Sequence, residues 1–88
     1  MKSMLEINLG EHKENSVAST TITFDEPVEH TEVSCGCLST SFKDNIVALN
    51  MSVGKVKNPD DEFFDRFVLL KINSKEYIVK ARVIRWLR

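Results

Sequence analysis

The sequence contains few of the residues and none of the motifs on which common catalytic sites depend. Among its 88 residues are two histidines, two cysteines, three glycines and one tryptophan. It lacks a phosphate-binding loop, the Gly-x-Ser-x-Gly motif of many hydrolases and the His-Glu-x-x-His motif of zinc peptidases. We therefore expect a protein that is not an enzyme and that needs no cofactor.

Long apolar segments are also missing. No run approaches the roughly 20 apolar residues that a membrane-spanning helix needs. Residues 1–6 contain no apolar segment of the kind found in a secretory signal peptide. We therefore expect a chain that is cytoplasmic when synthesised and makes no membrane contact. Thiols in that compartment are normally reduced, so Cys35 and Cys37 are expected to be free.

Acidic and basic residues are unevenly distributed, although the formal net charge is only −1. Residues 71–88 carry six basic side chains and one acidic one, whereas the rest of the chain carries six basic and twelve acidic ones. A basic end on an acidic body is suited to contact with a polyanion or to head-to-tail packing against copies of the same chain. The plainer alternative is a solvated strand whose lysines discourage edge pairing.

Apolar residues alternate with polar ones over most of the chain, which predicts β-strands. The clearest series contains Val47, Leu49, Met51 and Val53, and a first turn is expected over 10–16. Other predicted strands lie near 5–9, 17–24, 28–35, 38–42, 67–72 and 77–87. About seven short strands predict an all-β protein: an antiparallel immunoglobulin-like β-sandwich that forms one domain over residues 1–88.

The last strand has apolar residues on both faces. One face contains Tyr77, Val79, Ala81 and Val83, and the other contains Ile78, Lys80, Arg82, Ile84 and Trp86. Because the apolar residues reach almost to the end of the chain, we expect Ile84, Trp86 or Leu87 to be covered by another surface.

One segment allows two interpretations. Asn58, Pro59 and the acids that follow have the pattern of a helix start, and Phe63, Phe64, Phe67 and Val68 would then share a helical face. Phe64, Val68, Leu70 and Ile72 also fit the alternation of a strand. The dense β-forming residues of 67–72 favour the strand, with one helical turn near Asp60 left open.

The order of these features resembles a bacterial family of domains of unknown function with a Ser-Cys-Gly-Cys signature. The matching pieces are Asn8-Leu9-Gly10, Ile22-Thr23-Phe24, Ser34-Cys35-Gly36-Cys37 and the strand from Ile46 to Met51. Departures from that family include the short turn at 25–27 and Leu38 where a threonine is usual. The resemblance implies a sandwich of the hydin and major-sperm-protein kind, used for binding or scaffolding and not for catalysis.

Cys35 and Cys37 are the alternative candidates for chemistry. Two thiolates are enough for copper(I), but a closed zinc site needs four ligands, and neither His12 nor His30 has suitable spacing. A redox role would need a lowered thiol pKa, and no basic residue flanks the pair in sequence. In the structural alternative both are small core residues on one strand face, with a kink at Gly36.

Two further candidate sites have simpler explanations. Asp60, Asp61, Glu62 and Asp65 cluster on a loop, but without the central glycine of a calcium loop they indicate a solvated acidic turn. Nucleic-acid binding would fall to Lys80, Arg82, Trp86 and Arg88, and a net acidic chain with one aromatic residue there does not favour it.

The sequence therefore predicts a non-enzymatic module that works by protein–protein contact or self-assembly. We expect a small structural or assembly component, such as an accessory or decoration protein of a phage virion, and this last step rests on analogy. The predicted contact residues on the last strand and on an opposing acidic loop are Arg82, Ile84, Trp86, Arg88, Asp60 and Asp61.

Overall fold

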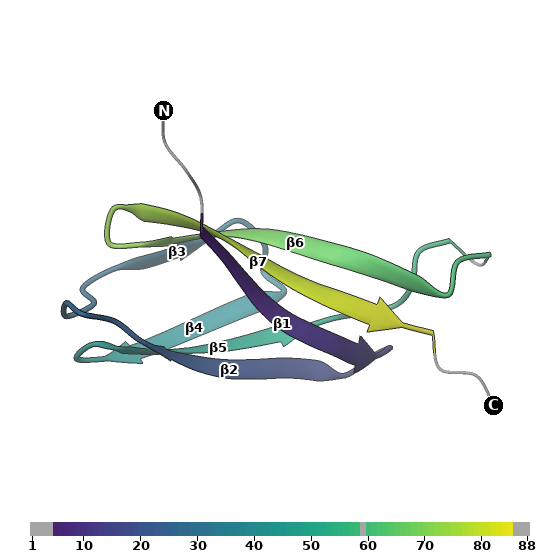
Figure 1. Ribbon diagram of the computed structural model, residues 1–88, viewed down its shortest axis with the longest axis horizontal. Coiled ribbons are helices and arrows are strands. Elements are labelled where there is room, and N and C mark those ends of the chain that lie inside the picture. Colours follow the sequence, from purple (N-terminus) through teal and green to yellow (C-terminus); the bar gives the residue numbers. More distant parts are fainter. Residues whose placement is uncertain (1–4, 59, 86–88) are drawn as a thin grey trace.

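The computed structural model describes residues 5–58 and 60–85, and these residues form seven β-strands and no helix. The strands are β1 (Leu5–Lys13), β2 (Val17–Thr23), β3 (Thr31–Val33), β4 (Leu38–Lys43), β5 (Ile46–Ser52), β6 (Phe63–Ile72) and β7 (Lys75–Ile84). Figure 1 shows two layers, a four-stranded sheet in the order β1-β7-β6-β3 and a three-stranded sheet in the order β2-β5-β4. In the described part of the chain, no helix could span a membrane.

The connections between the two sheets are those of an immunoglobulin-like sandwich. β2, β4 and β5 share one sheet and β3, β6 and β7 share the other, which matches the B, D, E and C, F, G strands of immunoglobulin domains. β1 pairs with β7 in parallel, and the other four strand pairs that the structure describes are antiparallel. The prediction of an all-β immunoglobulin-like sandwich of about seven strands is thus confirmed, with one parallel pair added.

Alternating residues from both sheets fill the core. The inward side chains of β5, β7 and the second half of β6 are buried, and no described polar or charged residue is buried with them. The sequence-based assignment of inward faces is confirmed for Val47, Leu49, Met51 and Val53, for Val68, Leu70 and Ile72, and for Tyr77, Val79, Ala81 and Val83. Since burial of apolar surface is the main favourable term in folding, these strands carry most of the stability.

The first strand is longer than alternation predicts. A turn is expected at Gly10, but β1 continues to Lys13, and its register against β7 shifts between Asn8 and Glu11. Gly10 adopts a left-handed φ of 86°, which a glycine tolerates without the strain that a Cβ would cause. Pairing with β7 therefore extends the strand across polar residues, and the turn follows at Asn15, whose φ is 64°.

The segment with two interpretations is a strand from Phe63 onward. Its described residues before Phe63 form turns and bends, without a helix. The side chain of Arg85 donates hydrogen bonds to the carbonyls of Asn58, at 2.7 Å, and Asp61, at 3.0 Å. Full-length pairing of β6 with β7, from Phe63 opposite Ile84, selects the strand over the helix.

Candidate functional site

The outer face of the four-stranded sheet contains a row of exposed apolar side chains on β6. Phe63, Phe67 and Leu69 are 47%, 61% and 50% exposed, while the alternate residues of the same strand point into the core. Isolated exposed apolar residues are ordinary on protein surfaces, but contiguous ones mark contact sites. We call Phe63, Phe67, Leu69 and their β7 neighbours Ile78 and Ile84 the apolar face.

β7 completes this face beside β6 (Figure 1). Ile78 lies directly opposite Leu69, and Ile84 directly opposite Phe63. Both isoleucines are half-buried by their neighbours. Lys80, opposite Phe67, lies between them and adds a positive charge. The face therefore combines aromatic, aliphatic and basic side chains on one rigid sheet.

Arg82 is held in place on this face by two neighbours. Its Nε donates to Asp65 Oδ1 at 2.8 Å and its terminal nitrogen to Oδ2 at 3.3 Å. Its guanidinium also lies over the ring of Phe63, 4.1 Å from the centroid. The hydrogen bond to Arg82 lowers the pKa of Asp65, and the same bond raises the pKa of Arg82.

A charged rim follows the apolar face at the end where β6 turns into β7. Lys71 pairs across the sheet with Glu76 on one side and Glu32 on the other. Glu32 also accepts a hydrogen bond from His30 at 2.8 Å, which together with the charge of His30 lowers the pKa of Glu32. An apolar centre with a polar rim is the usual composition of a protein contact surface.

The structure places the predicted contact residues in three groups. Arg82 and Ile84 lie on the apolar face and its margin. Asp60 and Asp61 lie on the turn before β6, which Arg85 of the same molecule holds. Trp86 and Arg88 lie outside the described residues. The acidic turn thus neighbours the basic strand within one chain, and its role against a second molecule stays a prediction.

Cys35 and Cys37 form a disulfide, so the expectation of two free thiols is wrong for this structure. Their Cα atoms are 5.2 Å apart, a usual separation for a disulfide. The chain bends between β3 and β4, which turns both side chains the same way, and both pack partly against the core. The kink does not require the special freedom of Gly36, since its φ is not positive.

A disulfide offers no thiolate to a metal ion, so the soft-metal alternative is limited to a reduced form. Among the residues that the structure describes, no group of three or more His, Cys, Asp or Glu side chains is placed to hold a metal. The cysteines instead line a shallow hollow of about 300 Å³ together with Lys57, Phe64 and Arg66. Folding thus supplies the basic neighbours that the linear sequence does not show.

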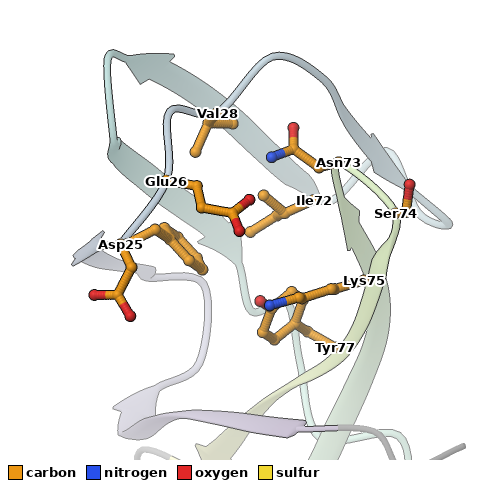
Figure 2. A pocket seen from close by; sticks show the side chains of 9 residues that line it. Asp25, Glu26, Val28, Ile72, Asn73, Ser74, Lys75 and Tyr77 are labelled. Carbon is orange, nitrogen blue, oxygen red and sulfur yellow. The ribbon is translucent and has the colours of Figure 1, made fainter.

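A second cleft, of about 290 Å³, opens at the end of the sandwich between the β2–β3 loop and the β6–β7 turn (Figure 2). Figure 2 shows the carboxylate of Glu26 extending across it toward Ile72, while that of Asp25 points away. Asn73 fixes one wall: its amide oxygen accepts from the backbone N–H groups of Glu29 and His30. We interpret this cleft as the structural joint that anchors the loop before β3.

The outer face of the three-stranded sheet differs sharply from the apolar face. Ser19, Thr21 and Thr23 alternate outward on β2, opposite Asn50, Ala48 and Ile46 of β5. Ser39 and Ser41 continue the pattern on β4, with Lys43 at its end. This hydroxyl-rich face provides control positions for experiments on the apolar face.

Phe63, Phe67 and Leu69 are not among the contact residues predicted from the sequence. The available signal was that β6, like the last strand, has apolar residues on both faces. Alternation predicted the inward residues of β6. Because a helix was the alternative for this segment, the exposed residues of the strand were not predicted as a surface.

Comparisons with known proteins give no functional assignment. No protein-family profile matches the chain, and no curated protein matches its sequence. Among solved structures it is similar to the M1 domain from titin, at 12% identity over 92% of this chain and 90% of that chain, with a TM-score of 0.40. The resemblance to the Ser-Cys-Gly-Cys family stays a prediction, and function is inferred from the surface of this chain.

Proposed function

We propose that this chain is a non-enzymatic protein–protein interaction module that binds through its apolar face. The role that suits a small sandwich of this kind is that of a structural or assembly component. An accessory or decoration protein of a phage virion is the setting we favour, by analogy. Arg82, Ile84, Trp86 and Arg88 belong to the proposed contact, because the alternation of the last strand continues through them.

The exposed row on β6 carries this proposal. Phe67 and Leu69 are 61% and 50% exposed, although each sits in the middle of a regular strand with paired neighbours. Burying one such side chain completely is worth about 1.5–3 kcal/mol. Aromatic residues and arginine are also the types enriched at contact surfaces, and here Phe63 and Arg82 are stacked together.

The charges on this face fit a protein partner better than a polyanion. Lys80 and Arg82 are accompanied by Asp65 on β6, and Glu11 lies opposite Arg82 on β1. Acidic groups among the basic ones repel phosphates, whereas a protein surface of mixed charge can match both signs.

A paired set of variants tests the apolar face. The association state of the wild type and of Phe67→Glu/Leu69→Glu would be measured by sedimentation velocity over a wide concentration range. We expect the wild type to self-associate and the variant to remain monomeric and folded by circular dichroism. The control, Ser19→Glu/Thr21→Glu, places the same charges on the hydroxyl-rich face and should associate like the wild type.

Trp86→Ala and Arg88→Glu extend the same test to the end of the chain. If Phe67→Glu/Leu69→Glu, Trp86→Ala and Arg88→Glu all associate like the wild type, the apolar face is refuted as a self-association surface. A strictly monomeric wild type would refute it too. Co-purification of a defined partner that the face variants lose, and the control keeps, would support it for a different protein.

The disulfide favours a second candidate function, thiol–disulfide exchange. The backbone N–H of Cys37 donates to Sγ of Cys35 at 3.1 Å, and Lys57 and Arg66 line the same hollow. A hydrogen-bond donor and nearby cations stabilise a thiolate, so Cys35 is the better leaving group when the bond opens.

The exchange would proceed in two balanced steps. A thiolate of an external dithiol attacks Sγ of Cys37, the Cys35–Cys37 bond breaks, and its electron pair leaves on Cys35. The second thiolate of the dithiol then attacks the first dithiol sulfur, which is bonded to Cys37 in the mixed disulfide. The dithiol closes to a disulfide and Cys37 is released. The dithiol is oxidised to a disulfide, and its two protons end on the reduced cysteines.

Dithiothreitol is the probe for this candidate. The rate of reduction would be followed by mass spectrometry across a pH series, in the wild type and in Lys57→Gln/Arg66→Gln. We expect slower reduction in the variant and a higher pKa for the released thiol. Identical rates and pH profiles in both proteins would exclude activation by these cations and leave the disulfide with a structural role.

A further inference from the structure

One edge of β6 is only half covered. β3 pairs with β6 at three positions, from Thr31 opposite Ile72 to Val33 opposite Leu70. Ser34 then adds two further hydrogen bonds to Leu69: its N–H donates to the Leu69 carbonyl, and its hydroxyl accepts from the Leu69 N–H. Beyond Ser34 the chain bends away into the Cys35–Cys37 turn. The edge of β6 from Phe63 to Phe67 therefore has no strand beside it in the described part of the chain.

The direction of the backbone groups along this edge follows from the ladder. In an antiparallel pair, residues alternate between bonding the partner strand and facing the other side. The bonds between Leu69 and Ser34 show that the backbone N–H and C=O groups of Leu69 point away from β7. Asp65 and Phe67, an even number of residues away, face the same side. The N–H and C=O groups of Asp65 and Phe67 thus point to the open edge.

No described residue satisfies these groups. The ladder of β3 ends before them, and no turn or side-chain hydrogen bond within 5–58 and 60–85 reaches the backbone of Asp65 or Phe67 from outside the sheet. An exposed row of unpaired donors and acceptors is a template for one more strand. The missing element is therefore an extended backbone, as in recognition by strand addition.

The side chains near this edge define the chemistry of the added strand. Lys57, Phe64 and Arg66 line the hollow on the inward side together with the disulfide, and Nζ of Lys57 lies 5.3 Å from the centroid of the Phe64 ring. Asp65, which also borders the hollow, is already bound by Arg82. On the outward side, Phe63 and Phe67 leave apolar surface exposed. An added strand would thus meet cations on one side and aromatic rings on the other.

We propose that the open edge of β6 binds an extended segment of a partner protein in which acidic and apolar residues alternate. The acidic side chains face Lys57 and Arg66, the apolar ones face Phe63 and Phe67, and the backbone pairs with Asp65 and Phe67. A second copy of β6 fits less well, because it would bring two Lys57–Arg66 pairs together without an acid to balance them. The inference rests on the proposed function and names its kind of partner.

A synthetic peptide tests the proposal. The probe is an acetylated peptide of about six residues that alternates glutamate with valine or phenylalanine. Binding to the ¹⁵N-labelled protein would be followed by amide hydrogen exchange. We expect exchange at Asp65 and Phe67 to slow roughly tenfold or more at saturation, while the amide of Leu69, already bound to Ser34, changes little. Absence of binding, or protection elsewhere, would overturn the proposal.

Two matched pairs isolate the backbone and the charges. Phe67→Pro removes the side chain and the edge-facing N–H and also fixes φ, whereas Phe67→Ala removes the side chain alone. Only the proline should therefore abolish protection at Asp65. If Phe67→Pro does not fold, a peptide N-methylated on its edge-facing amides replaces it. A peptide with lysine in place of glutamate should bind roughly tenfold more weakly, and equal binding would refute the acidic partner.

The outcomes separate this inference from the proposed function. Leu69→Glu lies on the apolar face and should weaken association while peptide binding persists. If association through the apolar face is observed but the peptide does not bind, the inference alone is wrong. If the protein alone self-associates with protection at Asp65 and Phe67, the occupant is a second copy and the acidic segment is wrong.

Discussion

Arg82 on β7 binds Asp65, its direct cross-strand neighbour on β6, with 2.8 Å between Nε and Oδ1. The arginine that the sequence predicts to meet an acid on another molecule therefore already meets one within its own chain. The pair also holds the guanidinium over Phe63, which fixes the orientation of both side chains on the apolar face. A partner would thus meet a preformed surface at this point, which reduces the entropic cost of binding.

The Asp65–Arg82 pair predicts a pH-dependent part of the stability. Because the pKa of Asp65 is lowered in the folded state, its contribution is present above the ordinary Asp pKa of about 4 and is lost as the pH falls through the lower folded value. We expect Asp65→Asn to be less stable than the wild type at neutral pH, with the difference shrinking below about pH 4. Urea unfolding at a series of pH values measures this, and a constant difference across the series would contradict it.

Leu49 lies on the inner face of its sheet and Leu69 on the outer face of the other sheet. The same substitution should therefore change the free energy of unfolding by very different amounts. Leu49 is fully buried on β5 and Leu69 is half exposed on β6. We expect Leu49→Ala to lower the free energy of unfolding by about 2–5 kcal/mol, because it leaves a cavity. Leu69→Ala should change it by less than about 0.5 kcal/mol. Denaturant unfolding compares them, and a large loss for Leu69→Ala would mean that this side chain serves the fold.

The side chain of Asn73 should stabilise the fold through its hydrogen bonds, separately from the left-handed backbone conformation of this residue. It adopts a φ of 56°, accepts from Glu29 and His30 at 2.8 and 3.2 Å, and donates to the carbonyl of Pro27 at 3.2 Å. Asn73→Gly keeps the left-handed backbone but removes these bonds, so we expect a cost of about 1–2 kcal/mol.

Asn15 provides the control for Asn73, since its φ of 64° is similar and no side-chain hydrogen bond is described for it. Asn15→Gly should be nearly neutral in thermal unfolding. Equal effects of the two substitutions would show that the Asn73 side chain does not anchor the loop before β3.

Two glycines, one at the register shift within β1 and one in the Cys35–Cys37 turn, differ in their need for a left-handed backbone. Gly10 has a φ of 86°, whereas Gly36 does not have a positive φ, and neither would bring an added Cβ within 4 Å of another group. We expect Gly10→Ala to cost about 1 kcal/mol from backbone strain alone and Gly36→Ala to cost less. Thermal melts of both variants test this, and the reverse order would show that the Cys35–Cys37 turn is the more demanding one.

The sequence by itself determined the fold class and the inward faces, because burial on one side of a sheet imposes a period of two. Val47, Leu49 and Met51 could be assigned to the core from their spacing alone. The same logic placed Phe64, Val68 and Leu70 inward once the segment was treated as a strand. Strand formation and the direction of each side chain depend on neighbouring residues in the sequence, so the alternation of apolar residues is enough to predict them.

Only the tertiary structure decided which residues surround each candidate surface and which strand edge stays open. The parallel pairing of β1 with β7, the short reach of β3 along β6 and the approach of Lys57 and Arg66 to Cys35 all join residues far apart in the chain. Alternation specifies the face of a side chain but not the neighbour of a strand. The open edge at Asp65 and Phe67 therefore follows from where β3 ends in space, which the sequence pattern leaves undetermined.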